Sequence, residues 1–308
     1  MSATAVSNDI PPLPSEPTLY EADPTSFSNV SDIYTKHLHL NLTADFDAQT
    51  LSGEAFLSMH VKAANLTTIT LDTNHLAIQA VHLYTDDKRD AATRQPLTYK
   101  LGDTHAAFGQ PLHITAPPST PATSTLTIGI TYTTTSGSVG LQWLQPSQTA
   151  GKKLPYLFTQ FQAIHCRTAV PVQDTPAIKF TYTADITVPS TLVALMSAPH
   201  LTSKPVSSAG STHTFHFSQP TPIPSYLLAL AVGNLTSRTI GPRSSVWSEP
   251  ETVEAGAYEF AETEQFLSTA ESIVGPYVWH TYDILLLPPS FPSDTHLHPQ
   301  TDEHHTRC

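Results

Sequence analysis

The sequence predicts a mainly β fold followed by a short mixed α/β unit. Apolar and polar residues alternate with a period of two in several runs between residues 38 and 232, as in strands that bury one face. The composition agrees, because Thr is β-branched and favours strands, while 27 Pro residues interrupt helices. Helical spacing of apolar residues begins only after residue 243. Many short strands separated by Pro, Gly and Ser turns indicate a sandwich or related twisted sheets.

The strands follow one another along most of the chain. Successive side chains of a strand point to opposite faces, so each alternating run places one face on a core and the other on water. The clearest run is 180–188, where apolar side chains alternate with Thr and Asp. The segments expected to form strands are 38–42, 55–62, 126–132, 180–188, 192–196, 214–217, 226–232 and 283–287.

One amphipathic helix is expected over residues 249–274. Ser248 and Glu251 have the spacing of a capping box at its start, and Gly275 followed by Pro276 ends it. Apolar residues recur between them at helical spacing, as expected for a helix with one buried face. These residues are Val253, Ala257, Phe260, Leu267, Ala270 and Val274. The helix and the apolar strand after it begin a second, mixed unit.

The chain is therefore divided into four parts. Residues 1–30 are rich in Pro, Ser and Thr without periodicity, which predicts a disordered extension. A β domain is expected over 31–238, the beginning of the second unit over 239–292, and an unrelated His-rich tail over 293–308.

Composition excludes several function classes. The formal net charge of −12 repels phosphate backbones, so no nucleic-acid partner is expected. The longest apolar run, 226–232, is far shorter than the ~20 residues that cross a bilayer, so no membrane partner is expected either. The first residues lack a basic start and an apolar segment, and two Cys residues imply no disulfide framework. These features predict a cytoplasmic protein.

Three strings of the sequence resemble the leukotriene A-4 hydrolase family of gluzincin zinc aminopeptidases. They span residues 156–189, 225–249 and 257–292, and the resemblance extends over about 34–292. It implies a saddle-like, twisted N-terminal β domain of the aminopeptidase N type, followed by the incomplete start of a thermolysin-like domain. In that family a Gly-x-Met-Glu-Asn strand and a His-Glu-x-x-His zinc helix come next, whereas this chain continues as SDTHLHPQTDEHHTRC. We therefore expect a truncated and inactive member.

The candidate substrate-binding residues are Gln160, Phe161, Gln162 and Ala163. From composition alone, the two glutamines would be ordinary residues on a solvated strand face. The resemblance implies instead that this segment is a loop that reaches into the catalytic cleft and binds short peptides. Gln162 corresponds to the glutamine that recognises the amino end of the substrate, which suits an amide with two donors and one acceptor.

His165, Cys166 and Arg167 follow directly and invite a comparison with a Cys–His nucleophile. If the segment is a strand, neighbouring side chains point apart, so Cys166 is expected to be a small buried hydrophobe rather than a nucleophile. Residues 173–176 read as a turn in which Asp174 accepts a hydrogen bond from its own backbone. The resemblance implies that Asp174 supports the substrate loop.

Zinc is the cofactor of the resembled family, but this chain is not expected to bind it specifically. The tail contains many side chains that can ligate a metal but has no apolar periodicity to fix their geometry. These are Asp294, His296, His298, Asp302, Glu303, His304, His305 and Cys308. No catalytic residue and no metal ligand is assigned.

Three functions remain open. The first is a truncated leukotriene A-4 hydrolase-like aminopeptidase, whose parent removes N-terminal residues from short peptides and in some members opens the epoxide of leukotriene A-4. The second is a non-catalytic domain that binds peptides or a partner through residues 160–163. The third is a structural β domain. In each case the apolar face of the helix over 249–274 and the strand over 283–287 would lack a covering element, so self-association is expected.

Overall fold

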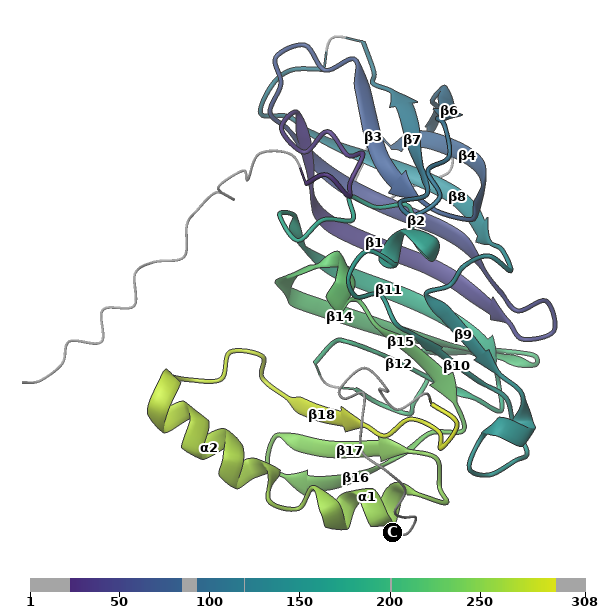
Figure 1. Ribbon diagram of the computed structural model, residues 1–308, viewed down its shortest axis with the longest axis vertical. Coiled ribbons are helices and arrows are strands. Elements are labelled where there is room, and N and C mark those ends of the chain that lie inside the picture. Colours follow the sequence, from purple (N-terminus) through teal and green to yellow (C-terminus); the bar gives the residue numbers. More distant parts are fainter. Residues whose placement is uncertain (1–22, 85–92, 119, 200, 292–308) are drawn as a thin grey trace, which may run out of the picture.

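The computed structural model describes residues 23–84, 93–118, 120–199 and 201–291. Most of this part is β structure, arranged as one large sheet, two smaller sheets against it and a separate unit that carries the helices (Figure 1). The predicted tail 293–308 and residues 1–22 of the predicted extension lie outside the described residues.

An eight-stranded sheet forms the body of the molecule. Its strands in spatial order are β13 (Ser207–Ala209), β14 (Thr212–Pro224), β11 (Lys179–Pro189), β1 (Ile33–Asp45), β2 (Thr50–Val61), β8 (Thr125–Thr134), β4 (Leu76–Tyr84) and β5 (Gln95–Pro96). β1 and β11 run parallel, with His37 opposite Thr181, and the other pairs are antiparallel. The central parallel pair thus joins segments that lie far apart in the sequence.

Two smaller sheets cover the apolar face of the large one. The first contains β3 (Thr68–Thr73), β7 (Gln110–Thr115) and β6 (Tyr99–Leu101). The second contains β12 (Val193–Met196), β15 (Leu230–Gly233), β10 (Tyr156–Thr159) and β9 (Leu141–Leu144). Side chains from all three sheets form one buried cluster, which is the core of this region.

The predicted alternation is confirmed most clearly in β11. Phe180, Tyr182 and Ala184 are fully buried, whereas Thr181 and Thr183 between them are partly exposed. The run 226–232 was expected to be one strand, but only residues 230–232 lie in a strand, β15. A 3₁₀ turn, η3 (Ser225–Leu227), precedes β15, because the Leu228 amide donates to the Ser225 carbonyl and bends the chain.

Part of the predicted N-terminal extension is also ordered. The Asp72 carboxylate of β3 accepts hydrogen bonds from the Ser26 hydroxyl at 2.6 Å, the Phe27 amide at 2.7 Å and the Ser28 hydroxyl at 2.8 Å. Short polar side chains that suggest disorder therefore serve here to bind one buried carboxylate. Residues 23–30 belong to the folded body.

The second unit consists of a three-stranded sheet and two helices. The sheet contains β16 (Thr236–Gly241), β17 (Ser244–Ser248) and β18 (Tyr282–Leu285), and the division expected at residue 238 falls within β16. β18 overlaps the expected strand 283–287 only over residues 283–285, and it is only partly buried. The helices α1 (Val253–Glu259) and α2 (Thr263–Val274) follow β17, and α2 ends at Gly275 as expected.

The helix expected over 249–274 is therefore interrupted. The Phe260 carbonyl accepts from both the amide and the hydroxyl of Thr263, at 3.1 and 2.7 Å, so a tight turn replaces the regular helical bond. The predicted capping box is also wrong. The Ser248 hydroxyl bonds the Thr252 hydroxyl at 2.7 Å instead of a helix amide, and α1 starts only after Thr252.

The second unit packs on the outer face of the sheet that contains β10. Phe158 of β10 lies with its ring centroid 5.1 Å from that of Phe291, and Trp247 of β17 belongs to the same buried cluster. The Glu249 carboxylate also accepts from the Ala150 amide at 2.7 Å and the Gly151 amide at 3.3 Å. No helix among the described residues is long and apolar enough to span a bilayer.

Candidate functional site

The predicted substrate-binding residues form a loop directly after β10. Gln160, Gln162 and Ala163 are exposed, whereas Phe161 is only 4% exposed and belongs to the core. The segment is not a strand beyond Thr159, because the His165 amide donates to the Phe161 carbonyl at 2.8 Å and closes a turn. The peptide bond between Gln162 and Ala163 is cis. Two amide side chains thus project from a loop that is anchored by a buried ring.

Gly140 supports this loop from the start of β9. The Gln160 amide donates to the Gly140 carbonyl at 3.0 Å, and the Gly140 amide donates to the Thr168 hydroxyl at 3.0 Å. A Cβ at Gly140 would lie 2.6 Å from the Thr168 hydroxyl and 2.9 Å from the His165 carbonyl oxygen. The close approach of the two backbone segments therefore requires glycine.

Residues 166–168 form a 3₁₀ turn, η2 (Cys166–Thr168), and not a strand. His165 and Arg167 do not share an exposed face, since His165 is half-buried and Arg167 is 1% exposed. Cys166 is fully buried, as predicted, and burial raises the pKa of its thiol well above the usual value. A thiol that stays protonated is a poor nucleophile, so no Cys–His chemistry is supported.

Arg167 is buried directly behind the loop, and its partners span the first region of the molecule. Its Nε donates to the Asp174 carboxylate at 3.0 Å, and its Nη1 lies 3.9 Å from the Asp72 carboxylate. Nη1 also donates to the carbonyls of Thr25 at 2.7 Å and Phe108 at 2.9 Å. The sequence showed an Arg within an apolar string but nothing that identified these partners.

Asp174 connects this cluster to η3, the turn that follows β14. It is 1% exposed and accepts from the Arg167 amide at 3.1 Å and from the Ser225 hydroxyl at 2.6 Å. Its hydrogen bonds are thus tertiary and not those of the turn expected at 173–176. Burial raises the pKa of the Asp174 carboxyl, although Ser225 and Arg167 act in the opposite direction. Its predicted structural role is confirmed.

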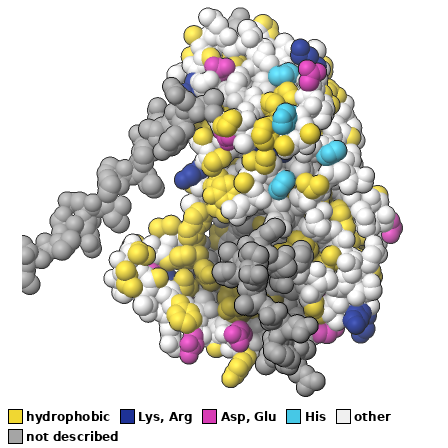
Figure 2. Space-filling view, in the orientation of Figure 1, with side chains coloured by type: hydrophobic (Ala, Val, Ile, Leu, Met, Phe, Trp, Pro, Cys, Tyr) yellow, Lys and Arg dark blue, Asp and Glu magenta, His cyan; other side chains and the backbone are white. Residues whose placement is uncertain are grey.

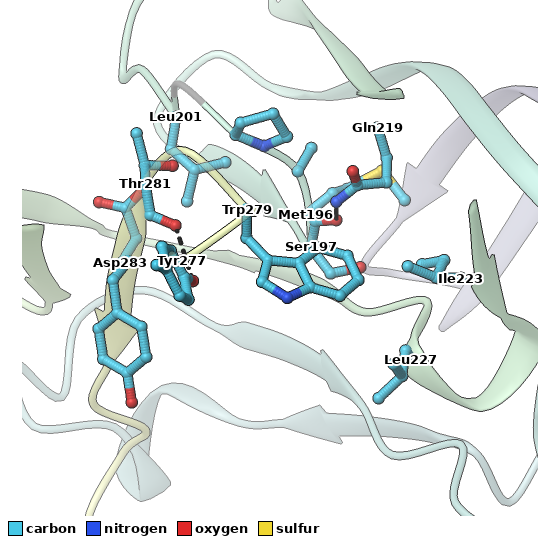
Figure 3. A pocket seen from close by; sticks show the side chains of 13 residues that line it. Met196, Ser197, Leu201, Gln219, Ile223, Leu227, Tyr277, Trp279, Thr281 and Asp283 are labelled. Carbon is cyan, nitrogen blue, oxygen red and sulfur yellow. Dashed lines mark hydrogen bonds between the residues drawn. The ribbon is translucent and has the colours of Figure 1, made fainter. Parts of the chain in front are cut away.

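Two cavities lie between the first region and the second unit. One of about 300 Å³ is lined by Thr159, next to the loop, and by Trp247 and Leu285. The other, of about 530 Å³, is shown in Figure 3, where Trp279 of the second unit and Gln219 of β14 both border the space. The Gln219 side-chain amide is fixed, because it donates to the Ser197 carbonyl at 3.1 Å. Sequence reasoning missed these cavities, since their walls come from distant segments.

The described residues do not fit a zinc ion. Within this part of the chain, no group of three or more His, Cys, Asp or Glu side chains converges on one point. The His-rich segment with its many potential ligands lies outside the described residues.

Comparison with protein families identifies the first region. A family model described as the Peptidase M1 N-terminal domain matches residues 30–227. Leukotriene A-4 hydrolase of Xenopus laevis is 44% identical over 271 residues, which are 88% of this chain and 43% of that protein. Leucine aminopeptidase 2 of Yarrowia lipolytica is 41% identical over 273 residues, which are 88% of this chain and 39% of that protein.

Solved structures agree with this result. Native yeast LTA4 hydrolase matches with a TM-score of 0.78 and 33% identity, covering 91% of this chain and 41% of that chain. An M1 zinc metallopeptidase from Deinococcus radiodurans bound to Tyr-Ser-Ala matches with a TM-score of 0.64 and 21% identity, covering 83% and 57%, which shows the fold alone. The expected mainly β fold is confirmed. The chain spans 39% to 43% of the length of its hydrolase and leucine aminopeptidase relatives.

Proposed function

Because the chain belongs to the peptidase M1 family through its N-terminal domain, we propose that it is the peptide-binding part of a leukotriene A-4 hydrolase-like aminopeptidase. One observation carries the proposal: Gln160 and Gln162 are exposed on a loop whose central ring, Phe161, is buried. A side-chain amide can accept from a peptide's free amino group and donate to its carbonyls. The loop therefore holds the amino-terminal end of a short peptide, with Gln162 on the amino group and Ala163 beside it.

The buried cluster behind the loop keeps the amides in place. Phe161 is fixed by the core, and Arg167 and Asp174 immobilise the turn that follows it. A preorganised loop loses less conformational entropy on binding than a flexible one. The adjacent cavity, lined by Thr159, accommodates the side chains of the bound peptide.

We propose that these 308 residues bind the peptide and do not hydrolyse it. The printed sequence contains no His-Glu-x-x-His, and the described residues do not fit a zinc ion. No catalytic step is therefore assigned to these residues, which span 39% to 43% of the length of the aminopeptidase and hydrolase relatives. A buried free thiol at Cys166 suits a reducing compartment, and we place the protein in the cytoplasm.

Calorimetric titration with Tyr-Ser-Ala and with its N-acetylated form tests the binding. We expect the free tripeptide to bind and the acetylated one to bind weakly, because acetylation removes the charged amino group. The substitution Gln162→Ala should weaken binding about tenfold, since it removes a hydrogen bond to a charged group. Gln79→Ala, at an exposed glutamine on β4, is the matched control and should leave affinity unchanged.

Two results of this titration would contradict the proposal. Equal binding of the free and acetylated peptides, unaffected by Gln162→Ala, would show that the loop does not recognise an amino end. No binding of either peptide would favour the structural β domain instead. A separate assay with a leucyl chromogenic substrate and added zinc should give no turnover, and turnover above a blank would overturn binding without hydrolysis.

A further inference from the structure

The segment 23–29 lies along the edge of β3 that faces away from β7 (Figure 1). The Asn29 side chain pairs with this edge, because its Nδ2 donates to the Thr68 carbonyl at 2.9 Å and its Oδ1 accepts from the Thr70 amide at 2.8 Å. The same segment supplies the two hydroxyls and the amide that donate to the Asp72 carboxylate. We call residues 23–29 the N-terminal strap.

The strap also contacts residues 167–174, which follow the substrate-binding loop. Nη1 of Arg167 donates to the Thr25 carbonyl at 2.7 Å, so the strap supplies one of the two carbonyls that hold this nitrogen. The Asp72 carboxylate contacts the same segment, because it accepts from the Asp174 amide at 2.9 Å. The strap, β3 and residues 167–174 are therefore joined by hydrogen bonds at one buried junction.

This junction contains more negative than positive charge. Asp72 is fully buried, Asp174 and Arg167 are each 1% exposed, and the two carboxylates share the single guanidinium. Figure 2 shows only scattered charged side chains on the visible face of the first region. A buried carboxylate is costly unless hydrogen bonds satisfy it, so the three donors of the strap are needed to keep Asp72 ionised in place.

The junction continues into the backbone of the substrate-binding loop. The Arg167 amide donates to the Asp174 carboxylate at 3.1 Å, and the next residue, Thr168, accepts from the Gly140 amide at 3.0 Å. Gly140 in turn accepts from the Gln160 amide at 3.0 Å. A short series of hydrogen bonds thus links the strap to the first residue of the loop.

We propose that Ser26 and Ser28 are positioning residues for peptide binding: by attaching the strap to Asp72 they fix the Gln160–Ala163 loop through Arg167. The inference rests on the proposed function, which it extends to a segment far from the loop in the sequence. When the strap detaches, the loop samples other conformations. Only the fraction of molecules with the loop in its binding conformation takes up peptide, so the apparent affinity falls by that fraction.

The double substitution Ser26→Ala and Ser28→Ala tests this role, because it removes two donors of Asp72 and leaves the backbone of the strap intact. Calorimetric titration with Tyr-Ser-Ala should show an affinity about threefold to tenfold lower than that of the native chain. Hydrogen exchange measured by mass spectrometry should show faster exchange of the amides in 160–168, whereas the amides of β11 should exchange at the native rate.

Two further variants separate positioning from general stability. The double substitution Ser26→Thr and Ser28→Thr retains both hydroxyls and should restore native affinity and exchange. The matched control is Thr187→Ala with Thr214→Ala, which removes two partly buried hydroxyls that bond each other at 2.9 Å in the large sheet. Whatever this control does to the unfolding midpoint, it should change neither the affinity nor the exchange of 160–168.

Three outcomes would overturn the inference. They are native affinity and native loop exchange in the alanine variant, an equal loss of affinity in the threonine variant, and an equal loss in the Thr187 and Thr214 control. Absence of binding by the native chain would instead refute the proposed function. The exchange rates of 160–168 would then decide alone whether the strap fixes the loop.

Discussion

Arg167 and Arg243 each face two acidic residues, but in opposite environments. Arg167 is 1% exposed, lies between Asp174 and Asp72, and contacts carbonyls of two other segments. The Arg243 side chain is 24% exposed and binds Glu264 and Glu271 on one helix. The first arginine joins segments from across the β region, whereas the second only attaches α2 to its own sheet.

The difference shows how the two regions are held together. Removing one partner of a buried ion pair leaves an uncompensated charge, while a pair that is partly open to water, like those of Arg243, adds less to stability. The first region also has a continuous apolar core, whereas α2 exposes Phe266, Ile273 and Val274 on the surface. The β region is therefore expected to be stable by itself and the second unit to be only weakly stabilised beyond its contact with β10.

The largest effect is expected from Arg167→Ala. This change leaves the Asp174 and Asp72 carboxylates buried without their cation, and we expect the free energy of unfolding to fall by about 3–5 kcal/mol. Urea unfolding monitored by circular dichroism measures it. Arg238→Ala, at an exposed pair with Glu254, should cost no more than about 1 kcal/mol. Equal losses for the two variants would remove the proposed difference between the regions.

The next largest difference in the free energy of unfolding is expected between two substitutions of apolar side chains, one buried and one exposed. Leu40 is 1% exposed in β1, so Leu40→Ala should lower the free energy of unfolding by about 2–5 kcal/mol through the lost contacts and the cavity. Phe266→Ala removes a larger side chain from the surface of α2 and should change it by less than about 0.5 kcal/mol. The same urea titration serves for both, and a large loss for Phe266→Ala would place its ring in a core.

Gly140→Ala tests whether the backbone beside the Gln160–Ala163 loop is more constrained than the backbone of the second unit. The added methyl group would meet the Thr168 hydroxyl at 2.6 Å and a backbone carbonyl, so we expect a loss of about 1–3 kcal/mol. Gly241 in the second unit is the control, because its nearest neighbour would be the flexible Glu264 side chain at 3.2 Å. If Gly241→Ala costs as much as Gly140→Ala, the loop is not specially constrained.

The smallest expected effect is a loss of local stability of α2 as the pH falls. The hydrogen bond from Arg243, helped by the Tyr277 amide, lowers the pKa of Glu271 to about 2 from its usual 4.5. A carboxyl whose pKa is lowered by folding stabilises the folded state above its unfolded pKa, and this contribution is lost as pH falls from 4.5 towards 2. Hydrogen exchange of α2 amides relative to those of β11 should therefore increase over this range. The increase should be absent in Glu271→Gln, and its persistence there would exclude Glu271 as the cause.

The sequence predicted the β region better than the helical unit, for a physical reason. Alternation in β11 reflects burial on one face and can be read from a single segment. The break between α1 and α2 depends on the Thr263 hydroxyl competing for one carbonyl, which apolar spacing does not reveal. The strand expected at 226–232 failed similarly, because a local amide bond to Ser225 bends the chain.

The candidate site could be predicted only in part from the sequence. The role of Gln160 to Ala163 came from the resemblance to a family, since two glutamines around an aromatic residue have no intrinsic signature. The burial of Phe161 and the support from Gly140 required the fold. The partners of Arg167, including Asp72, lie too far away in the sequence for any spacing rule to connect them.

The parallel pairing of β1 with β11 also constrains synthesis of the protein. His37 lies opposite Thr181, so the centre of the large sheet cannot close until residues up to about 189 have left the ribosome. Until then β1 presents an open edge with Leu38, Leu40 and Leu42 on one face, and such edges favour aggregation. A nascent chain of this length would depend on chaperones, and the dependence would end once β11 inserts beside β1.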